Sequence, residues 1–142
     1  MNRWQKVLDD ALEEFGAETG TLHLLEDGVL VLQAHAGIPE AILPVVSSIA
    51  VGKGMAGLAA QRNAPVDSCN IQVDDTGNVR PGARATGAQG ALTVPMRDAQ
   101  GAVAGTLGIA CPEERAWTAA ETSRLLALAS GLVAADGVVL EP

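Results

Sequence analysis

The chain has 142 residues with 17 acidic and 9 basic side chains, and its formal net charge is −8. A chain of this length folds as one domain with a sizeable core, and its acidity argues against a nucleic-acid partner, because phosphate backbones bind to lysine and arginine patches. Two cysteines without C-x-x-C spacing and 2% aromatic residues argue against a zinc site, a disulfide framework or a flat chromophore.

The composition therefore leads us to expect one domain over residues 1–142, with no cofactor and no bound metal. The first five residues lack the apolar core of a signal peptide, and no run of about 18 apolar residues occurs in the sequence. We accordingly expect a cytoplasmic protein that has no membrane partner.

Residues 2–15 are predicted to form an amphipathic helix. Apolar side chains from Trp4 to Phe15 recur at helical spacing with acidic residues between them, and Gly16 ends the pattern. The apolar stripe needs a partner, which is either the domain's own sheet or the same helix of a second subunit.

Two strands, residues 21–26 and 29–36, are predicted around Asp27-Gly28, a dipeptide that favours a two-residue hairpin turn. In this register His23 lies opposite Leu32, and His35 points to the other face of the hairpin. His23 is then expected to share its face with four residues, Thr21, Leu25, Leu30 and Ala34. The next stretch, 39–50, is predicted to be a short helix or turn that Pro44 interrupts.

The central segment, residues 49–67, is a glycine-spaced turn that feeds a short helix ending near Asn63. Gly52, Gly54 and Gly57 match the letters G-x-G-x-x-G, but a dinucleotide site requires a strand before them and a parallel crossover after them. The extended, proline-containing stretch 64–67 follows instead. We therefore interpret the glycines as turn and packing residues, although the free N–H groups at residues 54–56 could receive a carboxylate or phosphate.

Residues 68–85 form a loop that is long for a compact domain, and such loops are more often functional than idle. Arg80 and Arg84 in this loop are either surface charges or bidentate donors to a carboxylate or phosphate. Cys69 is either a small buried side chain or a redox-sensitive or ligand-touching thiol, since arginines lie nearby in sequence.

Residues 88–96 and 102–111 are predicted to form a second hairpin whose two faces differ in bulk. One face carries Ala88, Gly90, Leu92, Val94 and Met96 with Val103, Leu107, Ile109 and Cys111. The other face carries Gln89, Ala91, Thr93 and Pro95 with Ala102, Ala104, Thr106, Gly108 and Ala110. These smaller side chains cannot fill the space above a sheet, so a loop or ligand is expected to lie there.

A capping box at Thr118 to Glu121 opens a predicted C-terminal helix over residues 118–136. The resulting order is helix, hairpin, helical stretch, short strand, loop, hairpin and helix. That order favours an α+β fold with an antiparallel sheet.

Together these segments resemble a GAF domain over nearly the whole chain. The stretches that carry the resemblance are Thr21 to Leu30, Val51 to Ala59 with Ala64 to Asp67, Leu92 to Met96 and Val103 to Ile109. The resemblance implies a six-stranded antiparallel sheet, with the N- and C-terminal helices on one face and a small-molecule pocket with a loop and short helices on the other. In that arrangement the N-terminal helix is 2–15, the core is 19–112 and the C-terminal helix is 118–136.

One branch of this family, the free methionine-R-sulfoxide reductases, is enzymatic and depends on cysteines. The resemblance places its cysteine positions at Val46, Ala56 and Arg84, its substrate-binding carboxylates at Ala91, Gly108 and Ala110, and its aromatic pocket residues at Thr19 and His23. That chemistry is missing here, so we expect no enzyme. A thiol-dependent oxidoreductase using Cys69 and a pure dimerisation module are the alternatives.

We therefore predict a non-catalytic sensory domain that binds a small polar or anionic ligand between the small-residue face and the loop. The expected ligand-binding residues are His23, Gly54, Met55, Cys69, Asn70, Arg80, Arg84, Gln89, Thr93 and Thr106. As in related sensors, signal transduction would pass through the terminal helices to a second copy of the chain and to an unidentified downstream protein.

Overall fold

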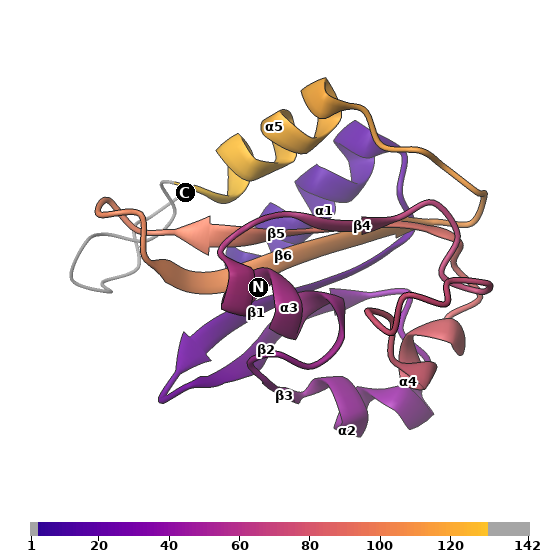
Figure 1. The fold of residues 1–142 in the computed structure, drawn as a ribbon, viewed down its shortest axis with the longest axis horizontal. Helices are drawn as coiled ribbons and strands as arrows, with labels where there is room; N and C mark the ends of the chain where they lie inside the picture. Colours follow the sequence, from indigo (N-terminus) through magenta and orange to yellow (C-terminus); the bar gives the residue numbers. More distant parts are fainter. Residues whose placement is uncertain (1–2, 131–142) are drawn as a thin grey trace.

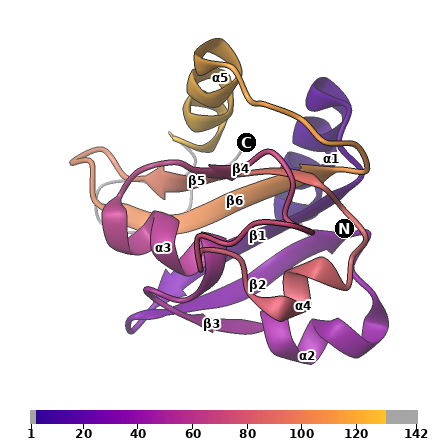
Figure 2. The same ribbon diagram turned by 45° about the vertical axis from the view of Figure 1, so that its right-hand side comes forward.

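The computed structural model describes residues 3–130 and has three layers. A six-stranded antiparallel sheet lies in the middle, with α1 (Arg3–Phe15) and α5 (Ala119–Ala129) on one face and three shorter α-helices with a 3-10 turn on the other (Figures 1 and 2). This is the α+β architecture predicted from the sequence. The C-terminal helix was expected to continue to residue 136, but α5 ends at Ala129, where Ser130 has an extended backbone, and residues 131–136 lie outside the described part of the chain.

The strand order in the sheet is β3-β2-β1-β6-β5-β4, so the first and the second hairpin meet at the centre, where β1 pairs with β6. The strands are β1 (Thr19–Glu26), β2 (Val29–Ala36), β3 (Ser48–Ala50), β4 (Val66–Ser68), β5 (Gly90–Arg97) and β6 (Val103–Cys111). The helical elements on the second face are η1 (Glu40–Ile42), α2 (Leu43–Val46), α3 (Gly54–Arg62) and α4 (Pro81–Arg84). Neither β3 nor α4 was recognised from the residue pattern, because each is only three or four residues long.

The main core lies between the sheet and the two terminal helices. Its buried members from the sheet include Leu22, Leu92, Val94, Met96, Leu107, Ile109 and Cys111, and those from the helices include Trp4, Leu8, Phe15, Leu125 and Ala129. Each fully buried aliphatic side chain of this kind stabilises the fold by roughly 1.5–3 kcal/mol. The apolar stripe of α1 is therefore covered by the domain's own sheet.

The opposite face of β5 and β6 carries the small side chains, as the alternation predicts. Ala91 and Ala110 on this face pack against Ile71 and Val79 of the loop that follows β4, in a second and smaller apolar cluster. Two alanines depart from the expected pattern. Ala88 precedes β5 and joins this second cluster, whereas Ala104 packs on the helix side, because the strand pairing shifts after Met96.

The first hairpin has the predicted register at its turn end, with Glu26 opposite Val29 and His23 opposite Leu32. The pairing then shifts by one residue between Leu22 and His23. Such a bulge moves every later side chain of the strand to the other face. The expected positions of Ala34 and His35 are therefore wrong: Ala34 lies in the helix-side core, and His35 pairs with Thr21.

Gly105 provides a test of how closely β1 and β6 approach at the centre of the sheet. A Cβ atom at this position would lie 2.2 Å from the backbone oxygen of His23. We expect Gly105→Ala to lower the free energy of unfolding by about 1–3 kcal/mol, because the backbone must shift to admit the methyl group. Urea unfolding followed by circular dichroism measures this change.

Gly82→Ala is the matched control, since a Cβ there meets its nearest neighbour, a methyl carbon of Val45, at 3.5 Å. Its effect should stay within about 0.5 kcal/mol. Equal destabilisation by the two substitutions would contradict the close approach of the strands.

Candidate ligand cavity

A cavity of about 330 Å³ lies on the small-residue face of the sheet. Its floor is made by the residues Thr19, Gly20, Thr21, Ala91, Thr93, Gly108, Ile109 and Ala110. The side chain of Ile109 belongs to the core on the helix side of the sheet. The other floor residues are no larger than threonine, so the floor leaves room that a protein core would normally fill. The small-residue face is thus covered without being filled.

Three segments form what we call the cover of the cavity. They are residues 38–50 with η1 and α2, residues 53–56 at the start of α3, and residues 71–86 with α4. The first and third segments touch each other, since a Cβ on Gly82 would lie 3.5 Å from Val45 and 3.9 Å from Ile42. Figure 2 shows α2, α3 and α4 gathered on this side of the sheet.

The glycine turn shapes the second segment of the cover. The N–H of Gly52 donates to the backbone oxygen of Gly57 at 2.8 Å, and a Cβ on Gly57 would lie only 2.5 Å from the backbone oxygen of Ala50. Gly54 has φ +67°, a conformation that favours glycine. The turn therefore presents the first residues of α3, Gly54 to Ala56, to the cavity.

Two cations, Lys53 and Arg80, stand in the cavity wall. The side chain of Arg80 lies across the start of α3, where its Cγ would be 2.9 Å from a Cβ on Gly54, the residue that follows Lys53. Neither cation forms an ion pair within residues 3–130, and none of the described lining residues is acidic. This part of the wall is positive although the chain as a whole has a net charge of −8.

The remaining wall is mainly aliphatic, with a few hydroxyl groups. The aliphatic side chains of the first cover segment are Ile38, Ile42, Val45, Val46 and Ile49, and the hydroxyl-bearing residues of the lining are Thr19, Thr21, Ser48, Thr86 and Thr93. Hydroxyl groups both donate and accept hydrogen bonds. The cavity therefore combines an apolar wall, a positive segment and several adaptable polar groups.

Four of the ten predicted ligand-binding residues line the cavity, namely Gly54, Met55, Arg80 and Thr93. Lys53 and the aliphatic side chains of residues 38–49 were not predicted. A cation next to the glycine turn was a signal available in the sequence. The aliphatic segment gave no such signal, because Pro44 obscured its secondary structure.

His23 and Thr106, both predicted to contact the ligand, lie beneath the cover rather than in the cavity wall. They are opposite each other in β1 and β6 and are 0% and 1% exposed. His23 Nε2 lies 2.8 Å from the backbone oxygen of Val46, a cover residue. His23 Nδ1 and the Thr106 hydroxyl have no hydrogen-bond partner among the described residues. Burial lowers the pKa of His23 below 6.5, against the opposing effect of its hydrogen bond to Val46.

Arg84, another predicted ligand-binding residue, is not part of the cavity lining, and its side chain contacts the backbone of the cover instead. Its Nε donates to the backbone oxygen of Ile71 at 3.0 Å, and its Nη2 donates to that of Asp74 at 2.7 Å. Gln72 completes the link by donating to the backbone oxygens of Arg84 and Ala88. Arg84 therefore fixes the conformation of the third cover segment.

Cys69, Asn70 and Gln89 lie at the edge of the cover, outside the cavity wall. Asn70 Nδ2 donates to Gln89 Oε1 at 3.4 Å and to Glu114 Oε2 at 3.1 Å. The backbone oxygen of Cys69 accepts from the N–H of Arg115 at 2.9 Å, and the side chain of Cys69 is exposed. These residues connect the cover to the segment between β6 and α5, and none of the three is part of the cavity lining.

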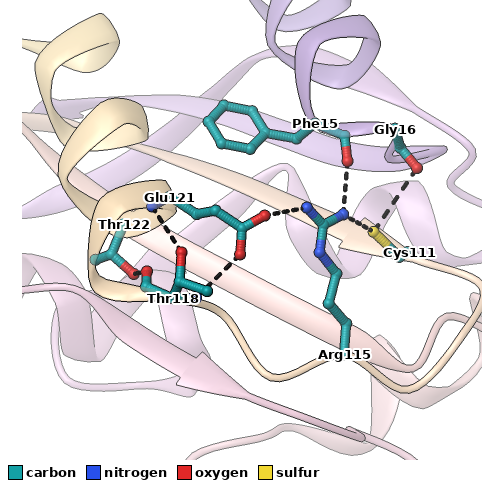
Figure 3. A network of polar contacts seen from close by, with 7 residues as sticks. All are labelled: Phe15, Gly16, Cys111, Arg115, Thr118, Glu121 and Thr122. Carbon is teal, nitrogen blue, oxygen red and sulfur yellow. Dashed lines mark hydrogen bonds and ion pairs between the residues drawn. The ribbon is translucent and has the colours of Figure 1, made fainter.

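Arg115 joins that segment to both terminal helices (Figure 3). Its Nη1 donates to the backbone oxygen of Phe15 at 2.6 Å and to Cys111 Sγ at 3.1 Å. Its Nη2 pairs with Glu121, whose other carboxylate oxygen accepts from the N–H of Thr118 in the capping box of α5. The guanidinium also lies 4.0 Å from the ring centroid of Trp117. One side chain thus contacts the end of α1, the end of β6 and the start of α5.

The family model of the GAF domain matches residues 4–135, and the chain therefore belongs to the GAF domain family. No curated protein matches the chain in sequence. Within residues 3–130, every helix is too short or too polar to cross a lipid bilayer. The same residues bring together no group of three or more His, Cys, Asp or Glu side chains that could hold a metal ion.

Solved structures with the same fold include both sensors and enzymes. The GAF domain of a phosphoenolpyruvate-protein phosphotransferase from Coxiella burnetii matches with a TM-score of 0.72 and 24% identity, covering 88% of this chain and 74% of that one. The type II free methionine-R-sulfoxide reductase from Thermoplasma acidophilum matches with a TM-score of 0.71 and 22% identity, covering 89% and 84%. A putative GAF sensor protein from Burkholderia vietnamiensis matches with a TM-score of 0.67 and 19% identity, covering 87% and 75%. At these identities the likeness shows the fold alone.

The buried imidazole of His23 gives the fold a specific pH dependence. Because burial lowers its pKa, the unfolded chain binds the proton more readily than the folded chain does. The stability that neutral His23 provides is fully present above its ordinary pKa of 6.5 and is lost as the pH falls toward the folded-state value. Urea unfolding between pH 6.5 and 5.5 should show this loss, with a slope of at most about 1.4 kcal/mol per pH unit from this one group.

His23→Gln removes the titrating group and keeps an N–H donor for Val46. We expect the variant to have a shallower dependence of unfolding free energy on pH in this window than the wild type has. Identical slopes in the two proteins would contradict the burial of a neutral imidazole.

Proposed function

We propose that this chain is a non-catalytic sensory GAF domain that binds a small polar or anionic molecule in the cavity. The observation that carries the proposal is a covered cavity whose wall, within residues 3–130, holds no carboxylate and two cations that form no ion pair there. Its volume of about 330 Å³ is within the range of small-molecule sites. Cations without protein partners provide the attraction that an anionic ligand needs.

The arrangement of thiols argues against an oxidoreductase. Neither Cys69 nor Cys111 lines the cavity, and both cysteines are free. Cys111 is buried in the helix-side core, where Arg115 contacts its sulfur. The reductases among the structural neighbours share the fold with this chain, but their activity does not transfer at 18–22% identity. A molecule bound in the cavity would therefore meet no nucleophilic sulfur from the described residues.

A pure interaction module is also a weaker interpretation, because it gives the cavity no purpose. A sheet face that serves only as a scaffold would be filled by side chains, since cavities reduce stability. Here the cover is held over the space by dedicated contacts, among them the two hydrogen bonds that Arg84 donates to the backbone at Ile71 and Asp74.

The contacts of Arg115 support a route from the cavity to the terminal helices. Ile71 lines the cavity. Two residues before it, the backbone oxygen of Cys69 accepts a hydrogen bond from the N–H of Arg115. The side chain of Arg115 then contacts Phe15 at the end of α1 and Glu121 in the first turn of α5. A shift of the cover on binding would reach both helices through this one residue.

The partners expected from the sequence remain proposals that follow from this route. The acidic, cysteine-poor composition supports a cytoplasmic location, and the two helices on one face of the sheet offer a surface to a second copy of the chain or to a downstream protein. Light scattering at micromolar concentration should give twice the chain mass of 14.4 kDa. A mass equal to one chain would reject the homodimer.

Retention of a molecule by the purified protein tests the sensory proposal directly. We expect native mass spectrometry of protein from its own host to show a retained small molecule, which non-denaturing dilution releases. Thr93→Met should lower the retained fraction at least tenfold, because the longer side chain enters the cavity from the floor.

Ser123→Met on the exposed surface of α5 is the matched control and should retain the molecule as the wild type does. The same retained fraction in Thr93→Met as in Ser123→Met would contradict binding in this cavity. Thermal unfolding of both variants checks that each of them is folded.

A further inference from the structure

We infer that the molecule bound in the cavity is an amphipathic anion, in which a single carboxylate or phosphate headgroup is attached to a compact aliphatic body. The inference rests on the proposed sensory function and specifies the chemical class of the ligand. Three features of the wall support it independently of one another: the position of the cations, the nature of the apolar residues, and the groups that the lining lacks.

The cations define where the headgroup binds. Lys53 precedes Gly54, and the Arg80 side chain packs against Gly54, so the two cationic residues are neighbours in the cavity wall. Lys53 and Arg80 are both exposed to solvent, so they form a charged entrance to the cavity and not a buried ion pair. The first residues of α3, Gly54 to Ala56, line the same part of the wall. A headgroup with one or two negative charges matches this entrance, because no protein carboxylate competes for the cations there.

The aliphatic residues define where the body binds. Ile38, Ile42, Val45, Val46 and Ile49 all line the cavity, and all five come from the first cover segment. All five side chains are β-branched, which restricts their rotation about χ1, and together they form the aliphatic part of the wall. Each methylene group of a ligand that is buried against such a surface should strengthen binding about fourfold.

The groups that the described lining lacks exclude other ligand classes. It contains no aromatic ring, so a nucleobase or flavin would have no side chain on which to stack. It contains no carboxylate, side-chain amide or imidazole, so the ammonium group of a free amino acid would have no charged acceptor, and the hydroxyl groups of a sugar would find no side-chain carboxylate or amide. An aliphatic body without further charges is the class that remains.

The volume of the cavity limits the size of the body. At roughly 15–30 Å³ for each small group of atoms, about 330 Å³ accommodates on the order of ten to twenty non-hydrogen atoms. Straight or branched carboxylates of up to eight carbons, which have at most about ten non-hydrogen atoms, therefore fit within this space and are suitable probes.

Isothermal titration calorimetry of the full chain with butanoate, hexanoate and octanoate, at constant ionic strength, tests the inference. We expect affinity to rise about fourfold with each added methylene group. Hexanamide and hexylammonium are the matched neutral and cationic probes, and they should bind at least tenfold more weakly than hexanoate does. Hexyl phosphate distinguishes the two headgroups: tighter binding than hexanoate identifies a phosphate ligand, and weaker binding identifies a carboxylate.

Variants separate the two ends of the cavity. Lys53→Ala combined with Arg80→Ala should weaken hexanoate at least tenfold, whereas Arg62→Ala, which removes an exposed cation at the far end of α3, should leave binding unchanged. Val46→Thr keeps the side-chain shape and should weaken octanoate more than butanoate. Circular dichroism confirms that each variant is folded.

Several results would overturn the inference. They are equal affinity for hexanamide and hexanoate, no loss in the double variant, and no binding by any acid of the series at millimolar concentration. If Thr93→Met still loses the molecule that the wild type retains, any of these results refutes only the amphipathic anion and leaves the sensory proposal intact. If Thr93→Met retains that molecule fully, the sensory proposal itself fails.

Discussion

The small side chains on one face of β5 and β6 are the constraint on which the rest of the structure depends. A sheet face built from alanine, glycine and threonine cannot form a dense core with a helix packed directly on it. The chain instead covers this face with short segments that are held by hydrogen bonds between side chains and backbone. The opposite face carries the bulky residues and provides most of the burial that stabilises the domain. The main core and the cavity thus lie on different sides of the same strands.

The contacts of three arginines, Arg80, Arg84 and Arg115, differ in whether the guanidinium donates to backbone carbonyl groups. Arg84 and Arg115 each donate to carbonyl groups of the chain, and their charges are occupied by structural contacts. Arg80 forms no ion pair within residues 3–130 and stands in the cavity wall. A guanidinium with several donors satisfies several carbonyls at once, which is why a loop of this length can be fixed without a large core of its own. The distinction depends on which carbonyls lie nearby, and not on the sequence around each arginine.

Much of the fold could be predicted from the sequence, because periodicity and turn chemistry are local properties. The Asp27-Gly28 turn set the register of the first hairpin correctly as far as His23, and alternation assigned the faces of β5 and β6. The bulge beyond His23, where the pairing skips Gln33, could not be predicted, since the turn residues and the alternation of the hairpin carry no signal for it. The site was harder to predict for the same reason: proximity in sequence suggested Arg84, Cys69 and Asn70, whereas the three-dimensional arrangement brings Lys53 to Arg80.

The contrast between the two cysteines has a practical consequence. Cys111 is 1% exposed in the core, whereas the side chain of Cys69 is accessible at the border of the cover. A thiol-specific fluorophore would therefore modify one position of the native protein without any engineered cysteine. That position is joined through its backbone to Arg115 and is two residues from the cavity wall. A fluorophore on Cys69 of the wild-type chain could therefore report changes in the cover of the cavity.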